Sequence, residues 1–221
     1  MASRIPVIEE FLSIEGEGSR AGRLCYFVRV AGCNLRCSYC DSTYSYDECN
    51  AEWKTAEQIF ANLQKSQCDL ITLTGGEPLL NEAVCKELLP MLIDYKKEVN
   101  IETNGSVDIE RAHRTTFDKV MITMDWKSLS SGMSDKMRKE NLELLQPRDV
   151  LKFVVGDRAD LDAMYDVLKS NHIRAQVYIS PIFGKIQMAE IVDFMKEKKM
   201  WDAKIQCQLH KIIWDPQERG V

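Results

Sequence analysis

Short apolar runs rich in β-branched residues alternate with longer amphipathic stretches along this chain of 221 residues. Six such runs predict strands, at Cys25–Ala31, Leu70–Thr74, Val99–Thr103, Lys119–Met124, Val150–Val155 and Gln176–Ser180. Helical periodicity predicts helices between them, over Thr55–Gln67, Glu82–Lys97, Ser134–Leu145, Asp160–Asn171 and Met188–Lys199. Strands that alternate with helices of this length indicate right-handed βαβ units and a parallel sheet.

The number of expected strands limits how the sheet can close. Six strands are too few for a closed eight-stranded barrel, so we expect an α/β fold with a partial, open six-stranded parallel β/α barrel. The connection Asp108–Thr116 is short and charged, which indicates a reduced or missing helix. No linker rich in Pro, Gly or Ser divides the sequence, so we expect a single domain over residues 1–221.

Composition narrows the classes of function. A hydrophobic content of 45% is enough for a full core. The formal net charge of −5, without any basic run free of acids, argues against a nucleic-acid-binding surface. No apolar stretch reaches the roughly 18 residues that a membrane span needs. Eight cysteines without a secretory leader indicate reducing cytoplasm and metal chemistry rather than disulfides.

Three of these cysteines are bunched in the segment Cys33-Asn-Leu-Arg-Cys37-Ser-Tyr-Cys40, directly after the first expected strand. Three thiolates can hold three irons of a [4Fe-4S] cube and leave the fourth iron open, which is typical of a reactive centre. A zinc loop or three buried free cysteines are the alternatives, but zinc sites usually have a second Cys or His pair. The setting of Cys49 forms no such pair.

Polar residues follow the next three expected strands, at the edge where a parallel sheet carries its active site. These segments are Thr74-Gly75-Gly76-Glu77-Pro78, Glu102-Thr103-Asn104-Gly105 and Asp125-Trp126-Lys127-Ser128. Two adjacent glycines let the backbone approach a ligand closely, and Glu77 can accept hydrogen bonds from an amino group. Each segment alone also fits a plain loop, but their succession predicts one ligand site.

The C-x3-C-x2-C loop, with Tyr39 before its last cysteine, resembles the signature loop of radical S-adenosylmethionine (SAM) enzymes. The Gly-Gly-Glu-Pro segment resembles the one that holds the methionyl amine in these enzymes. The resemblance implies a barrel of the radical-SAM type, in which the open iron binds SAM. It also implies that the reduced cluster yields a 5'-deoxyadenosyl radical, which the protein orients and shields.

Four segments narrow the resemblance: Phe11-Leu-Ser-Ile-Glu-Gly-Glu-Gly18, Phe27-Val-Arg-Val-Ala-Gly-Cys33, Cys40-Asp41-Ser42, and the tail Gln208-Leu-His-Lys-Ile-Ile-Trp214 with the end Glu-Arg-Gly-Val221. Together they resemble the 7-carboxy-7-deazaguanine synthases of queuosine biosynthesis, nearly end to end. The resemblance implies a lyase that converts 6-carboxy-5,6,7,8-tetrahydropterin to 7-carboxy-7-deazaguanine with loss of ammonia. It further implies Mg2+, a homodimer, and an electron donor such as flavodoxin or ferredoxin.

The resemblance also implies roles for individual residues. Cys33, Cys37 and Cys40 would bind the cluster, and Ser42 would bind Mg2+ through its hydroxyl, since this ion prefers oxygen ligands. The residues implied around SAM are Tyr39, Cys40, Asp41, Gly76, Asp125, Trp126, Lys127 and Ser180. Those implied around the pterin are Ile14, Glu15, Gly16, Arg29, Thr74 and the terminal carboxylate of Val221, with His210 beside them. No catalytic residue is expected beyond the cluster and SAM.

Elementary chemistry supports the pterin residues. A carboxylate such as Glu15 can accept paired bonds from the guanidine-like edge of a pterin, and Arg29 offers a fixed fork for its carboxylate. Mg2+ can bridge substrate oxygens. Without the motifs, each of three residues also has a structural interpretation. Arg29 could form a buried ion pair, Ser42 could cap a helix, and His210 could be a core residue. Many family members carry Gln at the position of Glu15, which here can only accept hydrogen bonds.

Two other classes stay open on sequence. A glycyl-radical-enzyme activating protein shares the cysteine loop, but it needs neither the Glu-Gly-Glu-Gly segment nor Ser42 nor a tail held by its carboxylate. A non-catalytic iron-sulfur or zinc module leaves the polar strand ends unexplained. The segment Asp41–Trp53 is long enough for its own helix or for a partner contact.

Overall fold

One nine-stranded sheet organises the computed structural model, which describes residues 3–116, 120–216 and 218–221. The strands are β1 (Ile5–Ile14), β2 (Leu24–Val30), β3 (Glu52–Lys54), β4 (Leu70–Gly75), β5 (Glu98–Thr103), β6 (Val120–Trp126), β7 (Val150–Val155), β8 (Gln176–Pro181) and β9 (Lys204–Ile205). Their order in the sheet is β3-β1-β2-β4-β5-β6-β7-β8-β9. From β2 to β9 neighbouring strands are parallel, whereas β1 is antiparallel to both β2 and β3.

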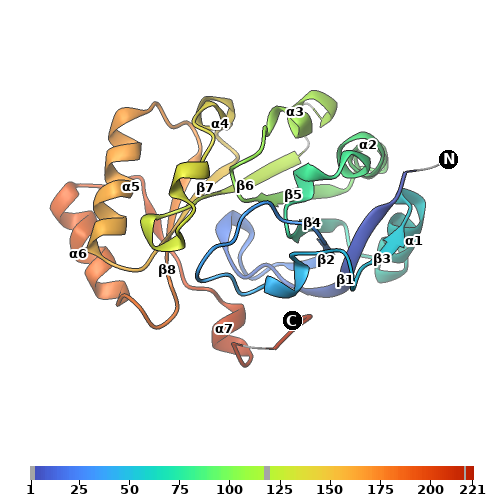
Figure 1. Ribbon diagram of the computed structural model, residues 1–221, viewed down its shortest axis with the longest axis horizontal. Helices are drawn as coiled ribbons and strands as arrows, with labels where there is room; N and C mark the ends of the chain where they lie inside the picture. Colours follow the sequence, from blue (N-terminus) through green and yellow to red (C-terminus); the bar gives the residue numbers. More distant parts are fainter. Residues whose placement is uncertain (1–2, 117–119, 217) are drawn as a thin grey trace.

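Helices cover the outer side of this open sheet. They are α1 (Ala56–Ser66), α2 (Leu89–Asp94), α3 (Glu110–Thr116), α4 (Glu140–Leu144), α5 (Arg158–Ser170) and α6 (Met188–Lys198), with a π-helical turn η4 (Val84–Leu88) leading into α2. A further short helix, α7 (His210–Ile213), lies in the C-terminal tail. Short 3-10 turns are η1 (Gly18–Arg20), η2 (Thr43–Ser45), η3 (Pro78–Leu80), η5 (Leu129–Ser131) and η6 (Ser134–Lys136). Figure 1 shows α1 to α6 in an arc around the sheet, with α7 and the C-terminus apart from them.

The six expected strands are present as β2, β4, β5, β6, β7 and β8, and they are adjacent and parallel. Of the fourth expected strand, Lys119 lies outside the described residues. The sequence patterns did not reveal β1, β3 or β9. Strand β1 carries the adjacent charges Glu9 and Glu10 beside a register shift, while β3 and β9 are too short for a periodic signal.

Two expected helices are interrupted, each for a local reason. The helix expected over Glu82–Lys97 starts as a π-turn and continues as α2, because Pro90 lacks the N–H that a regular ladder would use. The expected helix Ser134–Leu145 is wrong as a continuous element. Met137 is extended between η6 and α4, and its sulfur accepts a hydrogen bond from the Lys127 backbone N at 3.2 Å.

The core lies between the sheet and the outer helices. One hydrophobic cluster runs from Ile5 in β1 to Phe194 in α6. Strand β4 is buried over five consecutive residues, as expected for a parallel strand covered on both faces. The buried face of α6 centres on Ile191 and Phe194. Among the described residues, no helix combines the length and apolarity needed to cross a membrane.

Candidate active site

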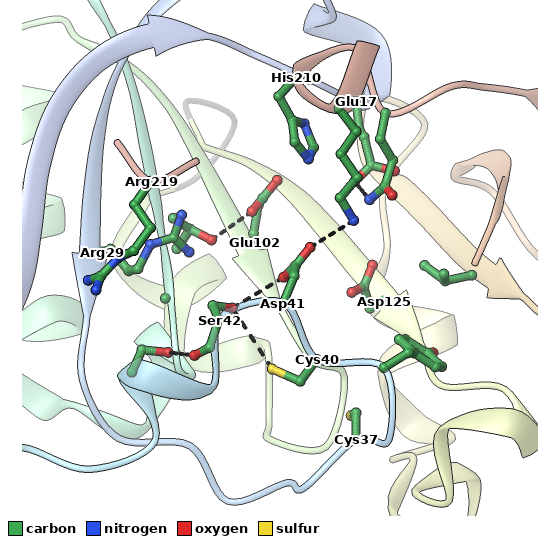
Figure 2. A pocket seen from close by; sticks show the side chains of 18 of the residues that line it. Glu17, Arg29, Cys37, Cys40, Asp41, Ser42, Glu102, Asp125, His210 and Arg219 are labelled. Atoms are coloured by element: carbon green, nitrogen blue, oxygen red, sulfur yellow. Dashed lines mark hydrogen bonds and ion pairs between the residues drawn. The ribbon is translucent and has the colours of Figure 1, made fainter. Parts of the chain in front are cut away.

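The carboxyl ends of the parallel strands, the segment after β1 and the C-terminal tail enclose a cavity of about 520 Å3. Most residues expected at the site line it: Ile14, Glu15, Gly16, Arg29, Cys33, Cys37, Tyr39, Cys40, Asp41, Ser42, Thr74, Gly76, Asp125, Lys127, His210 and Val221. Figure 2 shows Arg29 and Arg219 on one side of this cavity, His210 and Glu17 on another, and Cys37 and Cys40 at its base. Residues from both chain ends therefore meet at the strand ends.

Two of the expected SAM residues have side chains away from the cavity. Trp126 is 8% exposed and packs in the hydrophobic core. Side chains alternate along a strand, so Trp126 faces the core because Asp125, its neighbour in β6, faces the cavity. Ser180 is fully buried, and its hydroxyl donates a hydrogen bond to the Glu17 Oε1 at 2.8 Å. Neither side chain lines the cavity; both lie behind the residues that do.

The cysteine loop leaves the end of β2 and is held by backbone bonds. The Gly32 N donates to the Ser45 carbonyl at 2.9 Å, and the Ser38 N donates to the Ser131 carbonyl at 3.0 Å. The three thiols are free and partly exposed. Within the described ranges, no three His, Cys, Asp or Glu side chains converge on a single ion. A [4Fe-4S] cube fits this loop, because each thiolate binds its own iron at a separate corner.

Gly75 and Gly76 bring the end of β4 against the cysteine loop. A Cβ atom on Gly76 would lie 2.1 Å from the Gly32 carbonyl oxygen and 3.1 Å from the Cys33 N. Gly75 has a φ of 121°, a backbone conformation that favours glycine. Larger residues at these two positions would push the strand end away from the loop, so the glycines build this part of the wall.

Glu77 supports the site from behind, contrary to the expectation that its carboxylate meets a ligand amine. Its side chain is 1% exposed and accepts hydrogen bonds from the Leu79 N at 3.0 Å and the Asn104 N at 2.6 Å. The Thr103 hydroxyl donates to it as well. Burial raises the pKa of Glu77 to about 7. The carboxylate thereby joins the ends of β4 and β5.

A chain of alternating charges runs along one wall. The Lys152 Nζ lies 3.0 Å from the Asp125 Oδ1 and 3.1 Å from the Glu17 Oε2, and the Lys127 Nζ lies 2.7 Å from the Asp125 Oδ2. Burial opposes ionisation of Asp125, but the two lysines outweigh it and lower its pKa. Neither Lys152 nor Glu17 was predicted as a site residue from the sequence. A lysine inside the apolar strand Val-Leu-Lys-Phe-Val-Val was the available signal.

Glu9 connects several parts of the opposite wall. Its Oε1 accepts hydrogen bonds from the Arg29 Nε at 2.7 Å and from the Tyr44 hydroxyl at 3.0 Å. Its Oε2 lies 3.9 Å from the NH2 nitrogen of Arg219, whose guanidinium carbon lies 3.6 Å from the centroid of the Tyr44 ring. Arg29 therefore forms the ion pair considered above and also lines the cavity.

Glu15 is 2% exposed and lies deep in the cavity wall. The Thr72 hydroxyl donates a hydrogen bond to its Oε1, which lies 3.7 Å from the NH2 nitrogen of Arg20. Burial, followed by the nearby charge of Glu102, raises the pKa of Glu15. Glu102 also lines the cavity and accepts a hydrogen bond from the Thr74 hydroxyl at 2.7 Å. The sequence predicted that the segment beginning at Glu102 lies at the site, but it gave Glu102 itself no role.

The tail packs on the N-terminal segment. The Leu209 N donates to the Gly16 carbonyl at 3.0 Å, and a Cβ atom on Gly16 would lie 2.1 Å from the His210 Nδ1. Burial lowers the pKa of His210. The Lys211 Nζ lies 3.2 Å from the Asp41 Oδ2, and Gly220 and Val221 line the cavity beyond it. The last residues thus face the same space as the cysteine loop.

Ser42 precedes the short turn η2 without capping it through its side chain. Its hydroxyl lies 3.4 Å from the Asp41 Oδ1 and 3.9 Å from the Cys40 Sγ, at the cavity surface. The helix-cap interpretation of Ser42 is therefore wrong. The segment Asp41–Trp53 contains η2 and leads into β3 rather than forming its own α-helix.

Comparisons with known proteins agree with this arrangement. A sequence profile of the Radical SAM superfamily matches residues 27–145. A 7-carboxy-7-deazaguanine synthase of Clostridium acetobutylicum is 40% identical over 97% of this chain and 98% of its own. A second, from Methanospirillum hungatei, is 37% identical over 97% of this chain and 88% of its own.

The fold has counterparts among solved structures. The crystal structure of QueE from Escherichia coli superposes with a TM-score of 0.73 at 18% identity, covering 92% of this chain and 94% of that one. Streptococcus suis SuiB bound to its precursor peptide SuiA gives a TM-score of 0.58 at 15% identity, covering 82% of this chain and 48% of that one. The expected open barrel of the radical-SAM type is confirmed. The chain belongs to the radical SAM superfamily and, within it, to the 7-carboxy-7-deazaguanine synthase family.

Proposed function

We propose that this chain is a radical SAM lyase that converts 6-carboxy-5,6,7,8-tetrahydropterin to 7-carboxy-7-deazaguanine with loss of ammonia. The observation that carries the proposal is the meeting of three distant segments around one cavity. The cysteine loop, the Glu-Gly-Glu-Gly segment and the C-terminal residues all line it. The names and near-complete coverage of the relatives support the same reaction.

The family's cofactors, a [4Fe-4S] cluster and SAM, fit the base of the cavity. When bound, they supply a 5'-deoxyadenosyl radical for hydrogen abstraction. In our proposal Cys33, Cys37 and Cys40 hold the cluster. The residues that surround SAM are Tyr39, Asp41, Gly76, Asp125 and Lys127, with Trp126 and Ser180 supporting this region from behind. The dense ionic wall around Asp125 and Lys152 would keep these side chains fixed and limit the entry of water.

The proposed pterin site lies between Arg29 and the tail. The guanidinium of Arg29 would bind the pterin carboxylate, since Glu9 fixes its Nε and thereby the plane of the fork. Glu15 and the terminal carboxylate of Val221 would accept hydrogen bonds from the donor-rich edge of the pterin. Ile14, Gly16, Thr74 and Glu102 would complete the walls, and His210 would cover the N-terminal segment.

We further propose that Ser42 binds Mg2+. Its hydroxyl is free of a capping role, faces the cavity and lies beside the Asp41 carboxylate. Both groups are oxygen ligands of the kind that Mg2+ prefers, and substrate oxygens and water would supply the remaining ligands.

Other parts of the proposal concern the whole protein. We propose a single domain over residues 1–221, supported by the hydrophobic cluster that runs from β1 to α6. We propose a cytoplasmic homodimer that receives electrons from a carrier such as flavodoxin or ferredoxin and binds no nucleic acid. The net charge of −5 supports the absence of nucleic-acid binding, and the eight free thiols support a reducing cytoplasm.

The proposal is tested by turnover under anaerobic conditions. Protein with a reconstituted cluster is incubated with SAM, reductant, Mg2+ and 6-carboxytetrahydropterin, and products are followed by mass spectrometry. We expect a new species lighter than the pterin by the mass of ammonia. A Cys37→Ala variant serves as the control that lacks one cluster ligand. Formation of 5'-deoxyadenosine with an unchanged pterin would contradict the substrate and favour the glycyl-radical activase instead.

A further inference from the structure

The side chain of Asn104 lies against the cysteine loop and has no part in the roles proposed above. It stands at the end of β5 and is 7% exposed. Its Nδ2 lies 3.0 Å from the Asn34 Oδ1 and 3.7 Å from the Cys33 Sγ. The two N–H groups of this amide therefore have two acceptors, one of which is the sulfur of a cluster ligand.

Neighbouring groups fix which end of the amide faces the sulfur. The Asn104 Oδ1 accepts hydrogen bonds from the Ser106 N at 2.9 Å and from the Ser106 hydroxyl at 2.7 Å. A flipped amide would present its N–H groups to these two donors, so the observed orientation is the compatible one. The Asn34 Nδ2 donates to the Ser106 oxygen at 2.8 Å, which is consistent with this orientation.

The backbone of Asn104 is held just as firmly. The Asn104 backbone N donates a hydrogen bond to the buried Glu77 carboxylate. The backbone N of Glu77 in turn donates to the carbonyl of Gly32, the residue before Cys33, at 2.7 Å. Glu77 thus sets the distance between the end of β5 and the first cysteine. The contact between Asn104 and Cys33 is part of a connected frame rather than a chance approach of a mobile side chain.

We infer that the Asn104 amide donates a hydrogen bond to the Cys33 sulfur and thereby raises the reduction potential of the cluster that this thiolate would hold. Reduction adds negative charge to the cluster and its sulfur ligands. A hydrogen-bond donor at a ligand sulfur stabilises the reduced state more than the oxidised one, and such bonds are among the groups that set cluster potentials. Asn104 would act through Cys33, as a positioning and tuning residue.

Redox titration of the reconstituted protein, monitored by electron paramagnetic resonance without SAM or pterin, tests this inference. Asn104→Leu removes the donor at similar side-chain size, and we expect its midpoint potential to shift to a more negative value. Asn34→Leu is the matched control, because it breaks the same amide pair but leaves the donor to Cys33 in place. We expect Asn34→Leu to keep the midpoint of the unmodified protein.

A second variant guards against loss of the loop structure. Asn104→Asp keeps the shape and the acceptor for Ser106 but replaces the donor by an oxygen, so its midpoint should also become more negative. Iron content per chain is measured for each protein. Equal midpoints in fully loaded Asn104→Leu, Asn104→Asp and unmodified protein would overturn the inference, as would an equal shift in Asn34→Leu. Unmodified protein that assembles no four-iron cluster would instead contradict the cofactor.

Discussion

Lys211 and Asp41 form an ion pair with a separation of 3.2 Å between Nζ and Oδ2, across 170 residues of sequence. Asp41 directly follows Cys40, the last cysteine of the loop, whereas Lys211 belongs to α7 in the tail. The pair therefore connects the loop at the base of the cavity with the segment that covers it. Figure 2 shows Asp41 beside Ser42, with His210 of the tail above it.

Replacing Lys211 should loosen the tail. An ion pair with one exposed partner contributes about 0.5–1 kcal/mol, so Lys211→Met should raise the KM for the pterin by about two- to fivefold. Hydrogen exchange at the backbone of the tail should become faster in the same variant. Lys196→Met removes an exposed pair with Asp193 and should change neither quantity. A tail that exchanges at the unmodified rate in Lys211→Met would show that the pair does not hold it.

Arg29 should determine pterin binding more than turnover. A hydrogen bond to a charged group contributes about 1.5–3 kcal/mol, so Arg29→Ala should lower kcat/KM by about 10- to 100-fold, mainly through KM. Arg29→Lys keeps the positive charge but loses the forked guanidinium, so its kcat/KM should lie between those of Arg29→Ala and the unmodified protein. Steady-state kinetics with varied pterin measure this. Arg23→Ala removes an exposed arginine paired with Glu98 and serves as the control; an equal loss there would contradict the assignment.

Activity should depend on the position of the terminal carboxylate of Val221 in the cavity. Adding one glycine after Val221 moves the carboxylate along the cavity without changing any side chain, so we expect kcat/KM to fall at least tenfold. Appending a glycine to the N-terminus, which lies outside the described residues, is the control with equal added mass. Full activity of the C-terminally extended protein would remove Val221 from the pterin site.

Glu77 should make stability depend on pH. Its pKa is raised from 4.5 to about 7 by burial, so the folded state keeps a proton that the unfolded chain releases. The contribution of Glu77 to stability is then fully present below pH 4.5 and is lost as pH rises towards and through 7, by about 3 kcal/mol at roughly 1.4 kcal/mol per pKa unit. The hydrogen bonds that Glu77 accepts from the Asn104 and Leu79 backbone N–H groups limit this rise in pKa most, and the charge of Lys127 adds to their effect.

Glu77→Gln removes the titrating group at nearly constant shape. Denaturant unfolding of the protein without a cluster, between pH 5 and 8, should show a flatter pH dependence in this variant. Glu140→Gln on the surface should keep the slope of the unmodified protein. Parallel curves for Glu77→Gln and the unmodified protein would mean that Glu77 is already ionised in the folded state at pH 5.

The sequence predicted the parts of the site that lie next to each other along the chain. The cysteine loop and Arg29 belong to one continuous segment, and the strand that leads into it has a clear apolar pattern. The six parallel strands were predictable for the same reason, because buried strands are continuous apolar runs with helices between them. A local sequence pattern was sufficient to predict a feature wherever that feature lies within a single strand, helix or loop.

The missed features depend on which elements become neighbours. Strand β1 pairs with β2 in a register that places Glu9 beside Arg29. No sequence pattern in β1 predicts this register, so the role of Glu9 in the cavity wall was not predictable. Lys152 needs partners from β6 and the segment after β1 to be stable in the wall. For Trp126, the sequence did not say which of two adjacent residues in β6 faces the cavity, since both Asp125 and Trp126 have chemistry suited to a ligand.

An anaerobic crystal structure with the cluster, SAM and 6-carboxytetrahydropterin bound would test the central claim most directly. That claim is that the strand ends and both ends of the chain build one pterin site above the cluster. We predict the pterin carboxylate on the Arg29 guanidinium, the opposite edge of the ring near Glu15 and the Val221 carboxylate, and the cluster on Cys33, Cys37 and Cys40. A pterin bound outside this cavity, or one that leaves Arg29 in contact with Glu9 alone, would contradict it.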